Sequence, residues 1–87
     1  MEIYNETVII YTTDFCPYCN RAKNLLKAKK VNFREINITG DYKKLEQLEQ
    51  ETGFSTTPQI WIGSRFIGGC DDLYQLEIEK KLDELLQ

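Results

Sequence analysis

The segment Cys16-Pro17-Tyr18-Cys19 constrains the fold of this chain more than any other feature. It follows Thr7–Tyr11, a run of β-branched and aromatic residues that predicts a buried strand. Proline suits the first position of a helix, so Pro17 begins the next element and Cys16 becomes its N-cap residue. The two cysteines are therefore expected in a turn between a strand and a helix, close to the unpaired backbone N–H groups of the helix start.

Five further elements follow from the spacing of apolar and turn residues. They are a strand at 33–38, a helix from Tyr42 that Gly53 closes, a strand at 59–62, a strand at 65–67 after the hairpin turn Gly63-Ser64, and a helix with its cap at Asp72, capping-box spacing to Gln75 and leucines as far as Leu86. The order is β-α-β-α-β-β-α. The strand–helix–strand start implies a parallel pair, and the hairpin implies an antiparallel pair.

This order predicts an α/β fold, with a four-stranded mixed sheet flanked by three helices in a single domain at residues 1–87. In α/β sheets, ligands bind beyond the carboxyl ends of the parallel strands. The turn that carries the cysteines follows the first strand and therefore lies at that end. Topology and chemistry point to the same place.

The composition of the chain limits the kinds of partner that it is expected to bind. A formal net charge of −3 argues against nucleic acid, and no apolar run is long enough to span a membrane. The start MEIYNETVII lacks the features of a signal peptide, so we expect a cytoplasmic protein. Most of the basic residues gather just after the cysteines, which indicates a solvated helix face or a local field that attracts a small anion. These residues are Arg21, Lys23, Lys27, Lys29, Lys30 and Arg34.

The cysteine pair could hold a metal, staple the fold or exchange disulfides. A closed zinc site needs four ligands, whereas this chain has no histidine and one further thiol, Cys70, so a metal would have to be shared between two chains. A disulfide across two residues closes a tiny loop and contributes little stability. Thiol–disulfide exchange suits every feature, since Pro17 stiffens the turn and Tyr18 covers the approach to it.

The position of each thiol predicts its role. The N–H groups and dipole of the helix, with the positive charges of Arg21 and Lys23, should depress the pKa of Cys16 and favour its thiolate. Cys16 then attacks the substrate disulfide. Cys19, one turn into the helix, should be more shielded, and it resolves the mixed disulfide by attacking Cys16.

Three segments together resemble the glutaredoxins, and in particular their small bacterial dithiol class: CPYC at 16–19, TTPQIWI at 56–62 and GGCDDL at 68–73. The resemblance covers essentially the whole chain. It implies a thioredoxin-like fold and a glutathione-dependent oxidoreductase that reduces protein disulfides and protein–glutathione mixed disulfides. Glutathione is the implied reductant, with no tightly bound cofactor and no metal, and we expect a monomer.

The resemblance also implies a set of glutathione contacts. The residues of this set are Cys16, Tyr18, Thr57, Pro58, Gly69, Cys70, Asp71 and Asp72. Thr57-Pro58 corresponds to a cis-proline step, at which the main chain of Thr57 meets the cysteinyl part of glutathione. Gly69 would let the backbone approach the γ-glutamyl part, and Asp72 would take its α-ammonium group while also serving as a helix cap.

Three positions depart from the family pattern. Thr13 stands where a lysine is common, Phe54 where many members have arginine or glutamine, and Thr57 where valine is usual. The lysine and the arginine or glutamine usually meet the glycyl carboxylate of glutathione, and here Arg21 or Lys44 could replace them. Thr13 also removes a cation near the Cys16 thiolate, so a smaller depression of its pKa is expected.

Two other functions are compatible with the same fold. One is an electron donor reduced by a thioredoxin reductase, although GGCDDL suits γ-glutamyl binding. The other is an iron–sulfur carrier, a dimer sharing a cluster through Cys16 and two glutathiones, although cluster-binding relatives usually have small, flexible residues in place of Pro17 and Tyr18. Cys70 is either a small apolar filler or an accessory thiol that forms off-pathway disulfides.

Overall fold

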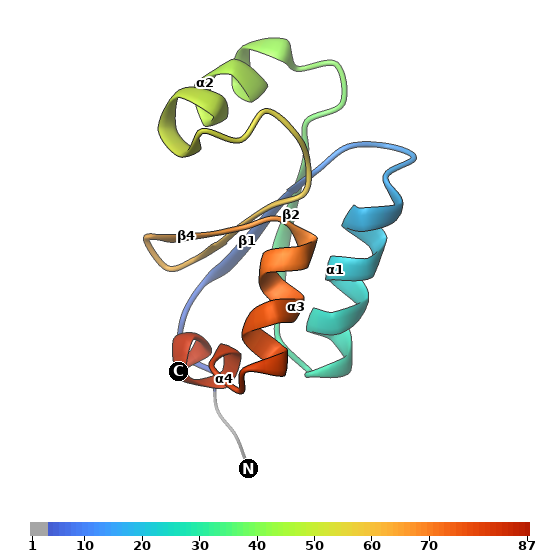
Figure 1. The fold of residues 1–87 in the computed structure, drawn as a ribbon. Helices are drawn as coiled ribbons and strands as arrows, with labels where there is room; N and C mark the ends of the chain where they lie inside the picture. Colours follow the sequence, from blue (N-terminus) through green and yellow to red (C-terminus); the bar gives the residue numbers. More distant parts are fainter. Residues whose placement is uncertain (1–3) are drawn as a thin grey trace.

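The computed structural model describes residues 4–87, and the predicted order of strands and helices is found there with one additional helix (Figure 1). The elements are β1 (Val8–Thr12), α1 (Pro17–Ala28), β2 (Phe33–Asn37), α2 (Tyr42–Thr52), β3 (Gln59–Ile62), β4 (Arg65–Gly68), α3 (Cys70–Ile78) and α4 (Leu82–Leu86). Within these residues, no helix combines the length and the apolar character that crossing a membrane would require.

The four strands form one mixed sheet in the order β2-β1-β3-β4. β1 runs parallel to β2, with Ile10 opposite Glu35, and antiparallel to β3, with Ile10 opposite Ile60. β4 returns antiparallel to β3 after the Gly63-Ser64 turn. The predicted sheet is therefore confirmed, and β1 occupies a central position that holds the start of the Cys16 loop in place.

The core lies on the face of the sheet that α1 and α3 cover, and these two helices run side by side in Figure 1. Val8 and Ile10 point to this face because alternate residues of a strand face the same side. They pack with buried residues of the helices, which are Ala22, Leu26, Leu73, Leu82 and Leu86. Tyr11 points to the other face, where the Lys44 ammonium of α2 lies 5.3 Å from the centre of its ring.

The last predicted helix is broken in two. α3 ends after Ile78 and α4 begins at Leu82, so the prediction of one continuous helix was wrong. Lys80 between them has a left-handed backbone with φ of 60°, and its N–H donates to the carbonyl of Glu77. The N–H of Lys81 donates to Leu76, which completes a Schellman motif with lysine where glycine is usual.

The start of α3 also differs from the prediction. The helix begins at Cys70, and its N-cap is Gly69 instead of Asp72. Asp72 is the third helical residue, and its carboxylate accepts a hydrogen bond of 2.9 Å from the N–H of Gly69. An acidic residue at this position satisfies a donor that would otherwise be unpaired, so Asp72 still caps the helix, but from inside its first turn.

The two ends of the described chain are tied together at the amino end of β1. The N–H groups of Asn5 and Glu6 both donate to the carbonyl of Leu86, at 3.1 and 3.0 Å. Nearby, the largely buried Lys29 ammonium joins three helices, because it contacts Glu77 of α3 at 2.9 Å and Asp83 of α4 at 2.8 Å. This end of the molecule lies opposite the Cys16 loop, which follows the carboxyl end of β1.

Candidate active site

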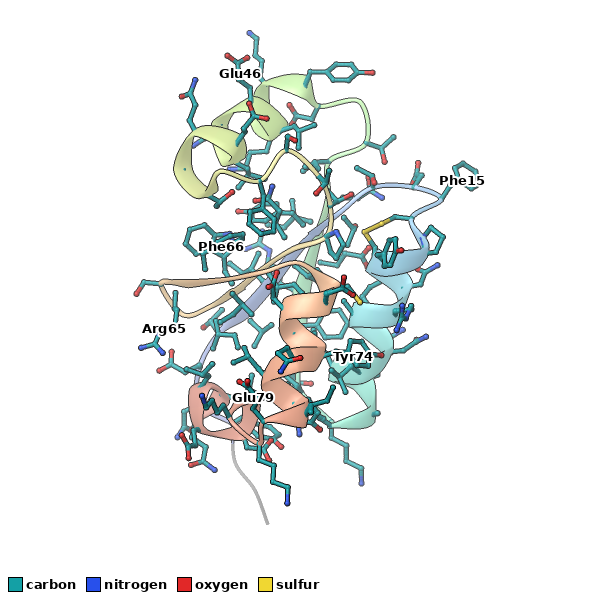
Figure 2. All side chains as sticks on the ribbon, in the orientation of Figure 1. Phe15, Glu46, Arg65, Phe66, Tyr74 and Glu79 are labelled. Atoms are coloured by element: carbon teal, nitrogen blue, oxygen red, sulfur yellow. A yellow bond between two sulfur atoms is a disulfide. The ribbon has the colours of Figure 1, made fainter. Side chains whose placement is uncertain are left out.

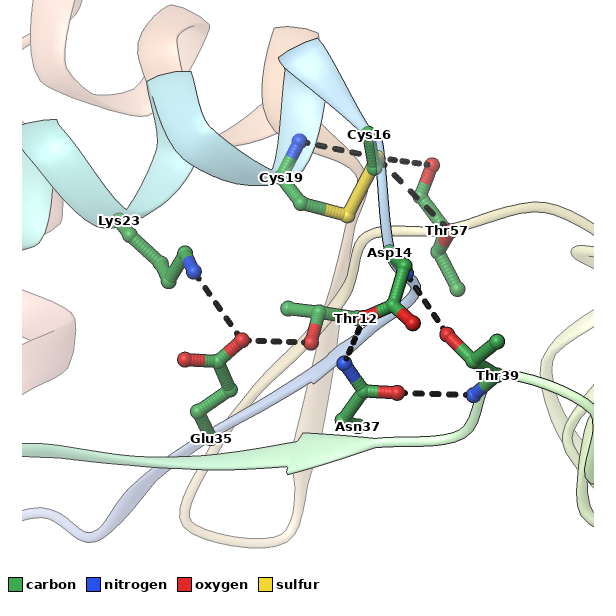
Figure 3. Close-up of polar contacts among 9 residues, drawn as sticks. All are labelled: Thr12, Asp14, Cys16, Cys19, Lys23, Glu35, Asn37, Thr39 and Thr57. Carbon is green, nitrogen blue, oxygen red and sulfur yellow. Dashed lines mark hydrogen bonds and ion pairs between the residues drawn. A yellow bond between two sulfur atoms is a disulfide. The ribbon is translucent and has the colours of Figure 1, made fainter.

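The two thiols of the CPYC segment meet at the start of α1, as the sequence predicted. Cys16 is the N-cap residue and Pro17 holds the first helical position. The Cys16 Sγ atom accepts a hydrogen bond of 3.1 Å from the N–H of Cys19, and it is joined to the Cys19 sulfur in a disulfide (Figure 3). A sulfur at this position faces backbone donors and the positive end of the helix dipole, both of which stabilise a thiolate.

The two cysteines differ in exposure. Cys19 is 1% exposed, whereas Cys16 is only partly buried, so the predicted shielding of Cys19 is confirmed. Phe15 and Tyr18, on either side of Cys16 in the sequence, are exposed. Figure 2 shows Phe15 at the tip of the loop, pointing away from the molecule. An incoming disulfide can therefore reach Cys16 but not Cys19.

The loop before β3 lies against the disulfide. The Thr57–Pro58 bond is cis, as expected, and the carbonyl oxygen of Thr57 lies 3.8 Å from the Cys16 Sγ atom. Fully buried Gln59 fixes this loop, because its amide group donates to the carbonyls of Phe54 at 2.8 Å and Thr56 at 3.1 Å. No role was predicted for Gln59 from the sequence, although an amide side chain next to a turn is a signal for such an anchor.

The Gly68-Gly69 segment approaches the same loop. A Cβ atom added to Gly69 would lie 3.6 Å from the Pro58 carbonyl oxygen and 4.0 Å from the Phe54 ring. Gly68 has φ of 121°, and a Cβ atom there would overlap the carboxylate of Asp72. Position 68 therefore requires glycine because of its own backbone conformation and the nearby Asp72 carboxylate, whereas a side chain at position 69 would make only ordinary contacts with the cis-proline loop. The three motifs, far apart in the sequence, are next to one another in the fold.

The acidic residues and the cysteine of the GGCDDL motif at 68–73 differ in their exposure. Asp71 and Asp72 are exposed at the start of α3, whereas Cys70 is 4% exposed and belongs to the core. Burial raises the pKa of the Cys70 thiol, against the opposing effect of Arg21. The packing agrees with the interpretation of Cys70 as a small apolar filler.

The basic residues that were expected to support the thiolate have partners of their own. The Lys23 ammonium donates to Glu35 at 3.1 Å, and the Arg21 guanidinium lies 5.4 Å from the centre of the Tyr74 ring. Glu35 also accepts a hydrogen bond of 2.7 Å from the Thr12 hydroxyl, and this bond, with that from Lys23, lowers the pKa of its carboxyl. The influence of Arg21 and Lys23 on Cys16 stays a prediction.

A polar network pins the Cys16 loop to the end of β2 (Figure 3). The N–H of Asp14 donates to the Thr39 hydroxyl at 2.7 Å, and the Asn37 amide donates to the Asp14 carboxylate at 2.9 Å. The N–H of Thr39 donates to Asn37 at 2.9 Å. None of these residues was predicted from the sequence, although polar side chains at the ends of two adjacent parallel strands indicate such a junction.

Phe54 belongs to an aromatic cluster beside the glycine segment. Its ring meets that of Phe66 edge to face at 5.1 Å, and Phe66 packs on Trp61 at 5.3 Å. The position at which the resemblance predicts arginine or glutamine therefore carries an apolar ring in this chain. Lys44, a suggested replacement, lies over Tyr11, and Arg21, the other, lies over Tyr74.

A cavity of about 520 Å³ lies away from the cysteines. Its lining includes Val8 and Phe33, the first residues of β1 and β2, so it opens at the amino end of the parallel pair. Within residues 4–87, no three His, Cys, Asp or Glu side chains gather closely enough to hold a metal ion.

A strand–loop–helix dithiol beside a cis-proline loop, on a mixed sheet of this order, defines a thiol–disulfide oxidoreductase with a thioredoxin-like fold. A family model described as Glutaredoxin matches residues 8–67. The chain belongs to the glutaredoxin family, which confirms the resemblance seen in the sequence.

Individual relatives agree with this assignment. A glutaredoxin of Pseudomonas aeruginosa is 53% identical over 91% of this chain and 94% of its own length. Glutaredoxin 3 of Escherichia coli K12 is 50% identical over 92% and 96%. The crystal structure of a buckwheat glutaredoxin–glutathione complex has a TM-score of 0.89 at 27% identity, covering 93% of this chain and 76% of that one. The solution structure of a glutaredoxin from Brucella melitensis has a TM-score of 0.83 at 51% identity, covering 92% and 87%.

Proposed function

We propose that this protein is a glutathione-dependent oxidoreductase that reduces protein disulfides and protein–glutathione mixed disulfides. Residues 1–87 would act as one domain, as a monomer in the cytoplasm. The observation that carries the proposal is the place of the Cys16 sulfur, which receives the Cys19 N–H at 3.1 Å and lies 3.8 Å from the Thr57 carbonyl oxygen. The nucleophile therefore sits between donors that stabilise its charge and a main-chain segment that can align a second sulfur.

The different exposure of Cys16 and Cys19 supports the following reaction. The Cys16 thiolate attacks a substrate disulfide and forms a mixed disulfide, while the other substrate sulfur leaves as a thiolate. Cys19 then attacks the Cys16 sulfur, releases the second substrate thiol and leaves the Cys16–Cys19 disulfide. One glutathione thiolate attacks Cys16 and frees Cys19. A second glutathione takes the first from Cys16, which gives oxidised glutathione and restores the dithiol.

The glutathione would lie along the two segments that flank the disulfide. Thr57 would pair its main chain with the cysteinyl residue of glutathione, beside Pro58 and the exposed Tyr18. Gly69 lets the backbone come close, and the exposed Asp72 has acceptor sites beyond the one it uses for the Gly69 N–H. The N–H groups at the start of α3, near Cys70 and Asp71, suit the γ-glutamyl carboxylate. The buckwheat relative, whose structure is a glutathione complex, supports this assignment by family.

The test is glutathione-coupled reduction of a small glutathione mixed disulfide by the intact protein and by Cys16→Ser and Cys19→Ser. We expect Cys16→Ser to fall to the uncatalysed rate, because no nucleophile remains. Cys19→Ser should keep most of the activity, because glutathione itself can resolve the mixed disulfide. On a protein disulfide, Cys19→Ser should lose most of its activity.

Separate reductants distinguish the alternatives. If glutathione fails and a thioredoxin reductase with NADPH supports turnover, the protein is an electron donor of that other system. Equal loss of activity from both cysteine variants would contradict the assigned roles. Visible absorption after anaerobic purification would indicate a cluster carrier.

A further inference from the structure

The hydroxyl groups of Thr13 and Thr57 are in contact beside the Cys16 sulfur. Their Oγ1 atoms are 2.8 Å apart, and the Thr57 Oγ1 atom lies 3.9 Å from the Cys16 Sγ atom, within hydrogen-bond range for sulfur. Both side chains are partly buried. Thr13 precedes the helix of the cysteines and Thr57 precedes the cis-proline, so 44 residues separate them in the sequence. These are also two of the positions at which the sequence was expected to depart from the family pattern.

The chemistry of the hydroxyl group gives the contact a direction. A threonine hydroxyl has one proton to donate and lone pairs to accept with. A thiolate can only accept, so when Cys16 is reduced and charged the Thr57 proton points to its sulfur. Thr13 must then donate to Thr57. The result is a chain of two hydrogen bonds that ends on the charged sulfur, in which each bond polarises the next.

We propose that Thr13 and Thr57 form a hydroxyl relay that stabilises the Cys16 thiolate, in which Thr57 donates to the sulfur and Thr13 acts through Thr57 as a positioning residue. This inference rests on the nucleophilic role proposed for Cys16. The relay adds a second donor to the Cys19 N–H, which already lies 3.1 Å from the sulfur. It would do with short-range dipoles what a lysine at position 13 was expected to do by charge, and contacts between partly buried groups are less screened by salt than an exposed charge.

The test measures the pKa of Cys16 from the pH dependence of its alkylation by iodoacetamide. The parent carries Cys19→Ser and Cys70→Ala, so that Cys16 is its only thiol. Thr57→Val keeps the shape of the side chain and removes the hydroxyl, and it should raise the Cys16 pKa by about half to one unit, the shift worth one net hydrogen bond. Thr57→Ser restores the hydroxyl and should return the pKa to that of the parent.

The remaining variants separate the relay from a general disturbance of the loop. Thr13→Val should raise the pKa by less than Thr57→Val, and adding it to Thr57→Val should change nothing further, because the chain is already broken. Thr56→Val is the matched control, since Thr56 is exposed on the same loop. It should leave the pKa unchanged.

An unchanged pKa in Thr57→Val, or a rise that Thr57→Ser fails to reverse, would overturn the proposal. Equal shifts in Thr56→Val and Thr57→Val would also overturn it. The measurement contains no glutathione. A protein that proves independent of glutathione can still show the relay, and the relay can fail in a protein that uses glutathione.

Discussion

Phe15 combines two features that rarely occur together. Its side chain is fully exposed, and its backbone φ is 56°, in the left-handed region that costs an ordinary residue about 1–2 kcal/mol. The ring makes no packing interaction that could offset this cost. The strain arises because the chain must turn sharply between Thr12, the last residue of β1, and the first residue of α1. Phe15 is therefore a position where the sequence is not optimal for the stability of the fold.

We predict that Phe15→Asn raises the free energy of unfolding by about 0.5–1 kcal/mol, because asparagine adopts the left-handed conformation more easily. Urea unfolding of the oxidised protein measures this change in the free energy of unfolding. Phe15→Ala is the control, since it removes the ring without easing the backbone. Equal stability of the asparagine and alanine variants would show that the strain is absent.

At the scale of an element, a non-glycine residue with a left-handed backbone also marks the break between α3 and α4. Lys80 takes the left-handed position that ends a helix, with φ of 60°. Lys30 does the same after α1, with φ of 59° and its N–H on the Lys27 carbonyl. The turn after Lys80 lets α4 fold back so that Leu82 and Leu86 reach the core. Both helix ends thus use lysine where glycine would fit without strain.

Lys80→Gly should therefore raise the free energy of unfolding by about 0.5–1 kcal/mol, which is the relief of strain less the entropy that glycine adds to the unfolded chain. Chemical denaturation followed by the fluorescence of Trp61 would detect this change. Lys80→Ala removes the same charge and keeps the strain, so it should bring no gain. A gain of equal size in the alanine variant would assign the effect to charge.

The order of elements was predictable because apolar spacing over a few residues determines each of them, as in Thr7–Tyr11. The end of α3 was not, since lysine in a left-handed position carries no local signal. At the site, CPYC and Thr57-Pro58 were found as motifs. The contact between Thr13 and Thr57 was not predictable, because it joins residues 44 positions apart that only the folded sheet brings together.

At the scale of the whole molecule, carboxylates at opposite ends are tied to lysines. Glu35 near the Cys16 loop pairs with Lys23, and Asp83 pairs with Lys29 at the far end. The hydrogen bond with Lys29 lowers the pKa of Asp83, as Thr12 and Lys23 lower that of Glu35. Burial opposes the charge of Lys29, but its hydrogen bonds with Asp83 and Glu77 outweigh this and raise its pKa.

The directions of these pKa shifts determine whether the stability of the protein rises or falls with pH. A carboxyl with a lowered pKa in the folded state stabilises the protein above the pKa of the unfolded chain, roughly 4, and loses this contribution as the pH falls through the folded value. We predict that stability declines with acid below about pH 4. The decline should be shallower in Glu35→Gln and Asp83→Asn. Because both pairs are partly exposed, each variant should lose under about 1 kcal/mol at neutral pH.

Urea unfolding at a series of pH values between about 2 and 7 tests this prediction. Glu46→Gln is a suitable control, since Glu46 is an exposed carboxylate that Figure 2 shows pointing into solvent from α2. If the Glu35 and Asp83 variants follow the same curve as the Glu46 variant, the two ion pairs do not carry the acid sensitivity.

The bonds from Asn5 and Glu6 to Leu86 bring the two ends of the described chain to one place, beyond the amino end of β1. Cys16 lies past the other end of that strand. Anything attached at either end, whether a second domain, a tether or an affinity tag, would hang on the side away from incoming disulfides. The two ends could equally be bridged and the chain reopened at the Gly63-Ser64 turn, and the circular permutant would keep its reactive face clear.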